Sequence, residues 1–229
     1  MSRSTAALIR VLVVIALPVL VVLTAARILV NTWYPVFEYS KADFPSDVFG
    51  FTQADRLALA PESIRFLNSP LPPEQAIAML EAQRLPGTDD PLFNEYELSH
   101  MVDVKRFTDL LWKVHFAAAA VVLGGLALLL SRATSRRDGY RAILHGGLLT
   151  TGLLIFLVLA VLVSWRTFFV TFHDLFFAPG TWTFNWGDSL IRLFPDRFWF
   201  DAGTLLTVGS LLTGVVVALV GFLLNRRGS

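Results

Sequence analysis

Four long apolar runs dominate the pattern of hydrophobic and polar positions, at residues 11–30, 108–130, 142–165 and 202–224. Each can form a helix that crosses the hydrocarbon core of a bilayer, which is about 30 Å thick and needs about 20 residues. Backbone groups in lipid must be hydrogen-bonded within the spanning segment, which favours helices over isolated strands. The sequence therefore predicts an all-α integral membrane protein with four transmembrane helices, organised as a single membrane domain over residues 1–229.

The first run has some features of a secretory signal peptide. Its apolar stretch is longer than the 7–15 residues that are typical of such a peptide, and three further spans follow it. We therefore interpret residues 11–30 as a retained transmembrane helix.

The segment between the first two spans, residues 31–107, is too long to be a simple connection. Thr52 followed by Asp55 has the spacing of a capping box and predicts a helix that ends at Ala60, before Pro61. A second helix is predicted from Pro72 to Leu85, where Leu-Pro-Gly marks a turn. We expect this segment to form a small helical cap outside the cytoplasm.

The segment between the third and fourth spans, residues 166–201, is rich in phenylalanine and tryptophan but carries acids and bases at intervals. It is too apolar for water and too polar for hydrocarbon. Irregular backbone at the depth of the membrane must be covered by protein or line a cavity. We therefore predict an interfacial aromatic-rich loop that lines a site.

Composition supports a membrane protein. Of the 229 residues, 55% are hydrophobic and 16% are charged, whereas about 25% of a typical soluble domain is charged. The chain has no cysteine, which excludes disulfides, thiolate metal ligands and a cysteine nucleophile.

The distribution of basic residues predicts the orientation. Residues 1–10, residues 131–141 and the C-terminal tail together carry eight arginines and one acid. Residues 31–107 carry six bases and twelve acids, and residues 171–201 carry two bases and four acids. Because lysine and arginine accumulate in cytoplasmic loops, we expect both termini in the cytoplasm and the two long segments outside.

Two of the four histidines are candidates for chemistry. His100 and His173 lie at the outer ends of the second and third spans, which a short loop brings together. His115, within the second span, and His145, at the cytoplasmic start of the third, are more consistent with structural roles.

Carboxylates accompany both candidate histidines. Glu97, His100 and Asp103 share one face of a helix, and Asp174 follows His173 directly. A histidine beside a carboxylate can act as a general base. The same spacing also fits solvated surface histidines, and a metal site is disfavoured because no zinc-motif spacing occurs.

Two motifs resemble a known family. Residues Phe93-Asn-Glu-Tyr-Glu-Leu-Ser-His-Met-Val-Asp-Val-Lys105 resemble the signature before the second helix of the bacterial lipoprotein intramolecular transacylases, Lit. Phe172-His-Asp-Leu-Phe-Phe177, with Trp182, Asp188 and Asp201 further on, resembles the second signature of that family. The four spans and the large first outer segment are similar as well.

The resemblance implies an acyltransferase of the bacterial cytoplasmic membrane that acts at the outer leaflet. Its substrates would be diacylated lipoproteins, whose N-terminal cysteine carries a diacylglyceryl group and a free α-amine. The enzyme would move an acyl chain from the glyceryl ester to that amine and so produce a lyso-form lipoprotein. No external acyl donor, cofactor or nucleic acid is implied, and the partners are lipoproteins and membrane lipid.

The resemblance also implies roles for individual residues. His173 is the expected general base, and His100 an oxyanion donor or second proton carrier, although these roles could be exchanged. The expected supporting residues are Asp174, Asp103 and Glu97, and Trp182 and Asp188 of the second motif are expected to bind substrate. The position of Arg166, at the outer end of the third span, makes it a third substrate-binding candidate. It could hold the lipid ester or pair with a catalytic carboxylate, or it could simply extend to the lipid headgroups.

Three other functional classes make different demands on the sequence. A non-catalytic membrane scaffold or assembly subunit would not depend on either histidine. A transporter or channel is disfavoured because the spans contain few ionisable groups and no paired repeat. An interfacial lipid ester hydrolase would release free fatty acid, because water would replace the amine.

Overall fold

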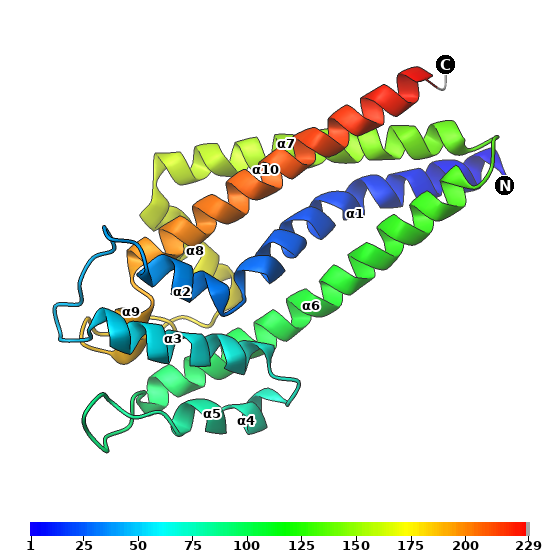
Figure 1. Ribbon diagram of the computed structural model, residues 1–229. Coiled ribbons are helices and arrows are strands. Elements are labelled where there is room, and N and C mark those ends of the chain that lie inside the picture. The colour runs from blue at the N-terminus through cyan, green and yellow to red at the C-terminus, as the bar shows by residue number, and fades with distance from the viewer. Residues whose placement is uncertain (228–229) are drawn as a thin grey trace. The chain divides into compact units, whose positions relative to one another are not determined.

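The computed structural model describes residues 1–227, which form ten helices and no strand apart from one isolated bridge. These residues divide into two compact units. Unit 1 contains residues 1–26, 111–164 and 204–227, and unit 2 contains residues 27–110 and 165–203. Several helices pass from one unit into the other, and α6 is one uninterrupted helix from Glu95 to Leu130 (Figure 1).

Four helices are long and apolar enough to cross a membrane, which confirms the predicted spans. They are α1 (Arg3–Leu29), α6 (Glu95–Leu130), α7 (Arg136–Val163) and α10 (Asp196–Arg227). Each begins or ends with polar turns that hydropathy alone does not detect. α6 in particular starts thirteen residues before the predicted span at residue 108.

Glycines allow the helices of unit 1 to approach closely. A Cβ atom on Gly147 would lie 2.4 Å from the backbone nitrogen of Ala218, and one on Gly221 would lie 2.3 Å from that of Leu144. α7 and α10 therefore pack backbone against backbone at these two positions, where the helices cross (Figure 1). Small residues are common where membrane helices touch, because lipid provides no hydrophobic driving force between helices.

The outward surface of unit 1 carries large apolar side chains, such as Phe156 at 72% exposed and Leu162 at 75%. An isolated exposed leucine is ordinary, but long helices that are apolar outside as well as inside indicate a lipid environment.

One end of unit 1 gathers the positively charged segments. Arg10 of α1 forms a 2.8 Å ion pair with Asp138 at the start of α7. At the same end, the last turns of α10 pack at Gly221 against the early part of α7 at Leu144. The start of α1, the last described turns of α10 and the turn before α7 therefore lie at one end, as four crossings require.

Unit 2 has its own hydrophobic core. Its helices, besides parts of α6 and α10, are α2 (Trp33–Tyr39), α3 (Gln53–Asn68), α4 (Pro73–Ala76), α5 (Ala78–Glu81), α8 (Trp165–Phe176) and α9 (Ser189–Leu193). The core contains aromatic residues from several of them, including Tyr34, Tyr39, Phe66, Phe93 and Phe198. The predicted helical cap therefore packs together with the aromatic-rich segment in one unit.

The first helices of the cap follow the sequence pattern in part. Thr52 and Asp55 form the predicted capping box, with the Asp55 amide 3.1 Å from Thr52 Oγ1. α3 then continues through Pro61 to Asn68, beyond the predicted end at Ala60. Proline lacks an amide hydrogen and usually ends or kinks a helix, but Pro61 is buried in this packed unit.

The helix predicted from Pro72 to Leu85 is two short helices, α4 and α5. The chain leaves the helical path after α5 because Leu85 donates its amide to Asp90 and Gln83 accepts from Leu92, which closes a loop. The predicted turn at Leu85-Pro-Gly is present, with Gly87 at a φ of 77°.

The aromatic-rich outer loop contains a helix that the pattern did not predict, α8. Its residues are mostly aromatic and β-branched, which are poor helix formers in isolation. After α8, a turn at Ala178-Pro-Gly-Thr181 is closed by a 3.1 Å backbone hydrogen bond, with Gly180 at a φ of 84°.

Candidate active site

His173 lies on α8 and presents one ring nitrogen for chemistry. Its Nδ1 is 2.7 Å from the carbonyl oxygen of Phe169. A carbonyl oxygen only accepts, so Nδ1 must donate. The neutral imidazole therefore carries its lone pair on Nε2, which is the atom that can remove a proton from a substrate.

Aromatic rings surround His173. Its ring centroid lies 4.1 Å from Phe169, 4.8 Å from Trp182 and 5.7 Å from Phe177. Burial among these rings lowers the pKa of His173 below its ordinary value, despite the opposing effects of the Phe169 carbonyl and the Asp174 charge. A lowered pKa keeps the imidazole neutral near pH 7, the form that a general base requires.

His100 lies near the start of α6, and only 7% of the residue is exposed. Its ring centroid is 5.2 Å from Phe177 and 5.3 Å from Phe184. His100 Nδ1 is buried and has no hydrogen-bond partner among the described residues. Because Phe177 contacts both imidazoles, the structure brings His100 and His173 together around one ring, close enough to interact electrostatically.

Trp182 follows the turn that ends at Thr181. The hydroxyl of Tyr96, in the first turn of α6, donates to the carbonyl of Gly180 and so attaches this turn to α6. The indole ring of Trp182 lies against His173 with the two planes inclined by 35°. Its Nε1 is buried and, within residues 1–227, has no hydrogen-bond acceptor.

Glu97 connects α6 to α9 and is 1% exposed. One carboxylate oxygen accepts from the Leu190 amide at 2.6 Å, and the other accepts from the Asn94 amide at 2.8 Å. Asn94 in turn accepts from the Glu97 amide at 3.0 Å, which completes a capping box. The carboxylate contacts backbone amides at these two places and, within residues 1–227, forms no hydrogen bond with His100.

Asp188 also bonds to the backbone. It accepts from the Asn185 amide at 2.8 Å and from the Asn94 side chain at 3.4 Å. Asp188 immediately precedes α9, and Glu97 accepts from Leu190 within α9. The two carboxylates therefore fix the start of α9 next to the start of α6.

The remaining carboxylates act on the histidines through charge. Asp103 forms a 3.0 Å ion pair with Arg106, which also binds Glu74 at 2.6 Å. Asp103 influences His100 electrostatically, and Asp174 influences His173. Asp174 itself is exposed, as is Arg166 on the same helix.

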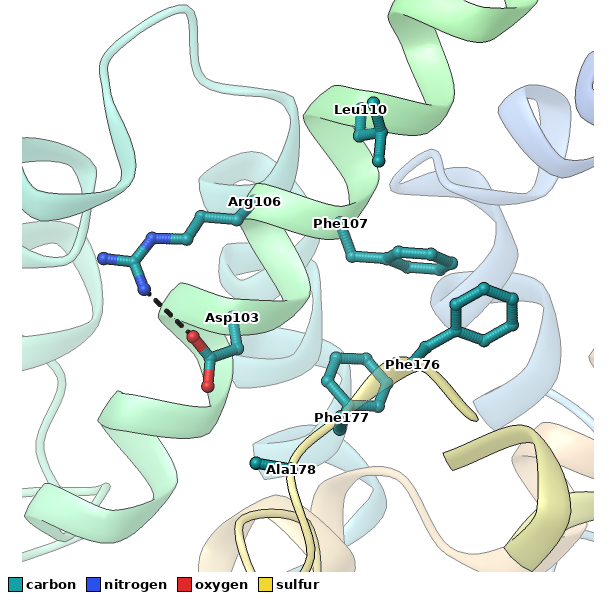
Figure 2. A pocket seen from close by; sticks show the side chains of 7 residues that line it. All are labelled: Asp103, Arg106, Phe107, Leu110, Phe176, Phe177 and Ala178. Carbon is teal, nitrogen blue, oxygen red and sulfur yellow. Dashed lines mark hydrogen bonds and ion pairs between the residues drawn. The ribbon is translucent and has the colours of Figure 1, made fainter. Parts of the chain in front are cut away.

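An open cavity of about 410 Å³ lies beside the histidines, between α6 and the end of α8. Figure 2 shows the rings of Phe107, Phe176 and Phe177 gathered on one side of it, and the ion pair of Asp103 and Arg106 on the other. The centroids of Phe107 and Phe176 are 4.6 Å apart. The cavity therefore has an apolar wall and a charged rim.

Phe177 belongs to both the cavity and the histidine cluster. It lines the cavity, and its ring contacts both imidazoles. Sequence reasoning missed Phe177, Phe107 and Arg106 as site residues. Only the spacing of Asp103 and Arg106, three residues apart on one helix, could have indicated the charged rim.

The other two histidines lie in unit 1. His115 Nε2 is 3.0 Å from the hydroxyl of Thr24 on α1, which is a contact between membrane helices. His145 is exposed on α7. No group of three or more histidine, aspartate or glutamate side chains in the described part of the chain is placed to hold a metal ion.

The site thus combines an imidazole, His173, whose Nε2 has no hydrogen-bond partner among the described residues, a second buried imidazole and an adjoining cavity with an apolar wall. The sequence profile of lipoprotein intramolecular transacylase Lit matches residues 11–199, most of the chain and both motifs. The chain belongs to the Lit family. The enzyme is therefore an acyltransferase of the lipoprotein intramolecular transacylase type, and this decides against a non-catalytic scaffold.

The chain is also similar to individual known proteins. An uncharacterized protein of Aquifex aeolicus is 28% identical over 216 residues, which cover 94% of each chain. The solved structure of the membrane-integral Lit of Bacillus cereus matches with a TM-score of 0.81 and 23% identity, covering 99% of this chain and 98% of that chain. A variant of that protein with a histidine replaced by alanine matches with a TM-score of 0.73 and 22% identity, covering 98% of this chain and 95% of that one. The Lit fold and a multi-pass membrane protein are thereby shown.

Proposed function

We propose that this Lit protein transfers an O-acyl chain within a diacylated lipoprotein, from the glyceryl ester to the α-amine of the N-terminal cysteine. The product is a lyso-form lipoprotein with one N-acyl chain and one remaining O-acyl chain. The observation that carries the proposal is the free Nε2 of His173, held neutral by burial beside His100 and an open apolar cavity.

The chemistry needs a base more than it needs a nucleophilic side chain. An α-amine has a pKa of about 7.7–8.0, so much of it is protonated at neutral pH and cannot attack. In the proposed reaction the neutral amine attacks the ester carbonyl carbon while His173 Nε2 removes its proton. The amine and the ester belong to one molecule, and this proximity already supplies a large part of the rate.

The surrounding residues fit supporting roles. The wall formed by Phe107, Phe176 and Phe177 suits an acyl chain, since each buried methylene contributes about 0.8 kcal/mol. His100 would relay protons with His173. We place Asp103 and Asp174 as charges that tune the two histidines, and Arg166 near the lipid headgroups. Glu97 and Asp188 would support the site indirectly, because both bond to the backbone around α9.

We further propose that the enzyme lies in the cytoplasmic membrane of a bacterium, with both termini inside and unit 2 at the outer leaflet. The charge asymmetry of the chain supports this orientation. Thr134→Cys and Thr88→Cys place the chain's only thiol at exposed positions. In intact cells, an impermeant thiol reagent should label Thr88→Cys and spare Thr134→Cys, and the opposite result would reverse the orientation.

The product decides between transfer and hydrolysis. The purified protein in detergent micelles would be given a synthetic peptide with an N-terminal S-diacylglyceryl cysteine, and the products analysed by mass spectrometry. Transfer leaves the mass unchanged and moves one acyl chain to the amine, which fragmentation of the peptide locates. Release of free fatty acid with an unmodified amine would instead identify an interfacial lipid ester hydrolase.

A further inference from the structure

The buried indole nitrogen of Trp182 is a polar group without a visible purpose in the fold. Its Nε1 has no acceptor among the described residues. Leaving a buried donor without a partner costs about 1–3 kcal/mol, and native structures contain few such groups. The neighbouring turn is held by Gly180 and by the hydrogen bond from Tyr96. The position of Trp182 is therefore fixed by the fold.

The position of the ring associates this donor with the base. Trp182 and His173 lie with their centroids 4.8 Å apart and their planes inclined by 35°. The two rings are in direct contact, which places the indole donor in the same aromatic cluster as the imidazole. A base and a donor that are neighbours can act on the same reacting group.

We propose that the indole N–H of Trp182 donates a hydrogen bond to the oxyanion of the tetrahedral intermediate in the acyl transfer. The inference rests on the proposed function and assigns a catalytic role within it. An indole N–H is a donor only and does not ionise near neutral pH, so it stabilises an oxyanion without becoming a competing base.

The step balances with the groups present. The amine nitrogen forms a bond to the ester carbonyl carbon, and the carbonyl π electrons move to oxygen, where Trp182 donates. The amine proton passes to His173 Nε2. When the intermediate collapses, the bond from carbon to the glyceryl oxygen breaks, and this oxygen takes the proton from His173. An ester and an amine become an alcohol and an amide.

The substrate reaches this donor from the adjoining cavity. Phe177 lines the cavity and touches both imidazoles, with centroids 5.7 Å from His173 and 5.2 Å from His100. In the proposed reaction, rotation of this ring lets the ester carbonyl pass from the cavity to the histidine cluster, where the Trp182 ring lies 4.8 Å from that of His173.

The test compares two tryptophans of the same loop. Trp182→Phe removes the N–H but keeps an aromatic ring, and Trp186→Phe changes a side chain that is 74% exposed. Loss of one oxyanion donor typically lowers kcat by about 10²–10³-fold. For the diacylglyceryl lipopeptide, Trp182→Phe should lower kcat to this extent with KM little changed, and Trp186→Phe should match the wild type.

A second variant separates the hydrogen bond from ring packing. Incorporation of benzothienylalanine at position 182 replaces the N–H by sulfur and keeps the size of the bicyclic ring. An equal fall in kcat in this variant supports the donor role even if Trp182→Phe folds poorly. Wild-type kcat in this variant would overturn the proposal while the wild type still made N-acylated product. Failure of the wild type to make that product would instead overturn the proposed function.

Discussion

Two kinds of buried polar group occur in unit 2, and they differ in how their atoms are partnered. Both oxygens of Glu97 accept backbone amides, and Asp47 Oδ2 accepts from the Phe51 amide and the Arg192 side chain. His100 Nδ1 and Trp182 Nε1 are equally hidden but lack partners among the described residues. The first kind holds the fold together, whereas in the proposed mechanism these two unpartnered atoms are available to a substrate. Arg56 Nε and Ser63 Oγ, elsewhere in unit 2, also lack partners among the described residues.

The difference has an energetic meaning. A buried polar atom with a hydrogen bond contributes about 0.5–1.5 kcal/mol to stability, whereas one without a partner lowers stability. Native structures keep a buried atom without a partner where function requires it, and this is most often in an active site. Substitutions should therefore separate the two kinds of group, some removing activity and others removing stability.

The largest expected effect is on catalysis. His173→Ala removes the proposed base, and general acid–base assistance is typically worth about 10²–10⁴-fold in rate. The rate of N-acylation should fall to this extent, whereas the thermal unfolding midpoint in detergent should change little. His145→Ala, on α7 in unit 1, is the control and should keep the normal rate. Normal rates in both His173→Ala and His100→Ala would contradict the proposed mechanism.

A smaller effect, on stability, is expected at Glu97. Glu97→Ala leaves the amides of Leu190 and Asn94 without acceptors and should lower the free energy of unfolding by about 1–3 kcal/mol. This corresponds to roughly 2–4 °C in the unfolding midpoint per kcal/mol for a chain of this size. Glu95→Ala, an exposed position on the same helix, is the matched control. An unchanged midpoint in Glu97→Ala would mean that this junction does not stabilise unit 2.

The smallest effect is a change in the slope of the pH–rate profile. The rate requires a neutral amine and a neutral His173, and burial places the pKa of His173 below its ordinary 6.5. As pH falls below the amine pKa, the logarithm of kcat/KM should fall with a slope of one. The slope should steepen to two only at a pH below 6.5. In His173→Ala the slope should remain one, and steepening there would assign the second proton to another group.

Much of the fold could be predicted because apolar runs have a direct physical meaning in lipid. The four spans and the Thr52 capping box depend on local sequence, and both are confirmed. The continuation of α3 through Pro61 and the formation of α8 depend on tertiary packing, which overrides local propensity. The prediction that residues 1–229 form one membrane domain stays a prediction.

The site was only partly accessible from sequence. The pairing of His100 with His173 followed from where the spans end, and the structure brings both to Phe177. The roles assigned to the individual site residues stay predictions. Sequence spacing placed Glu97 on one helical face with His100, but it could not show that the Leu190 amide, 93 residues away, would occupy its carboxylate. Nor could it show which buried atoms would remain without partners.

The continuity of α6 has a consequence for the geometry of the reaction. Within unit 2, this one helix carries His100, Asp103 and Phe107 with no break between them. Inserting a single residue between His100 and Phe107 would shift the imidazole by about 1.5 Å and turn it by about 100° relative to the cavity wall. The helical register of α6 thus sets both the position and the heading of His100 beside the cavity, and no loop can absorb an error in either.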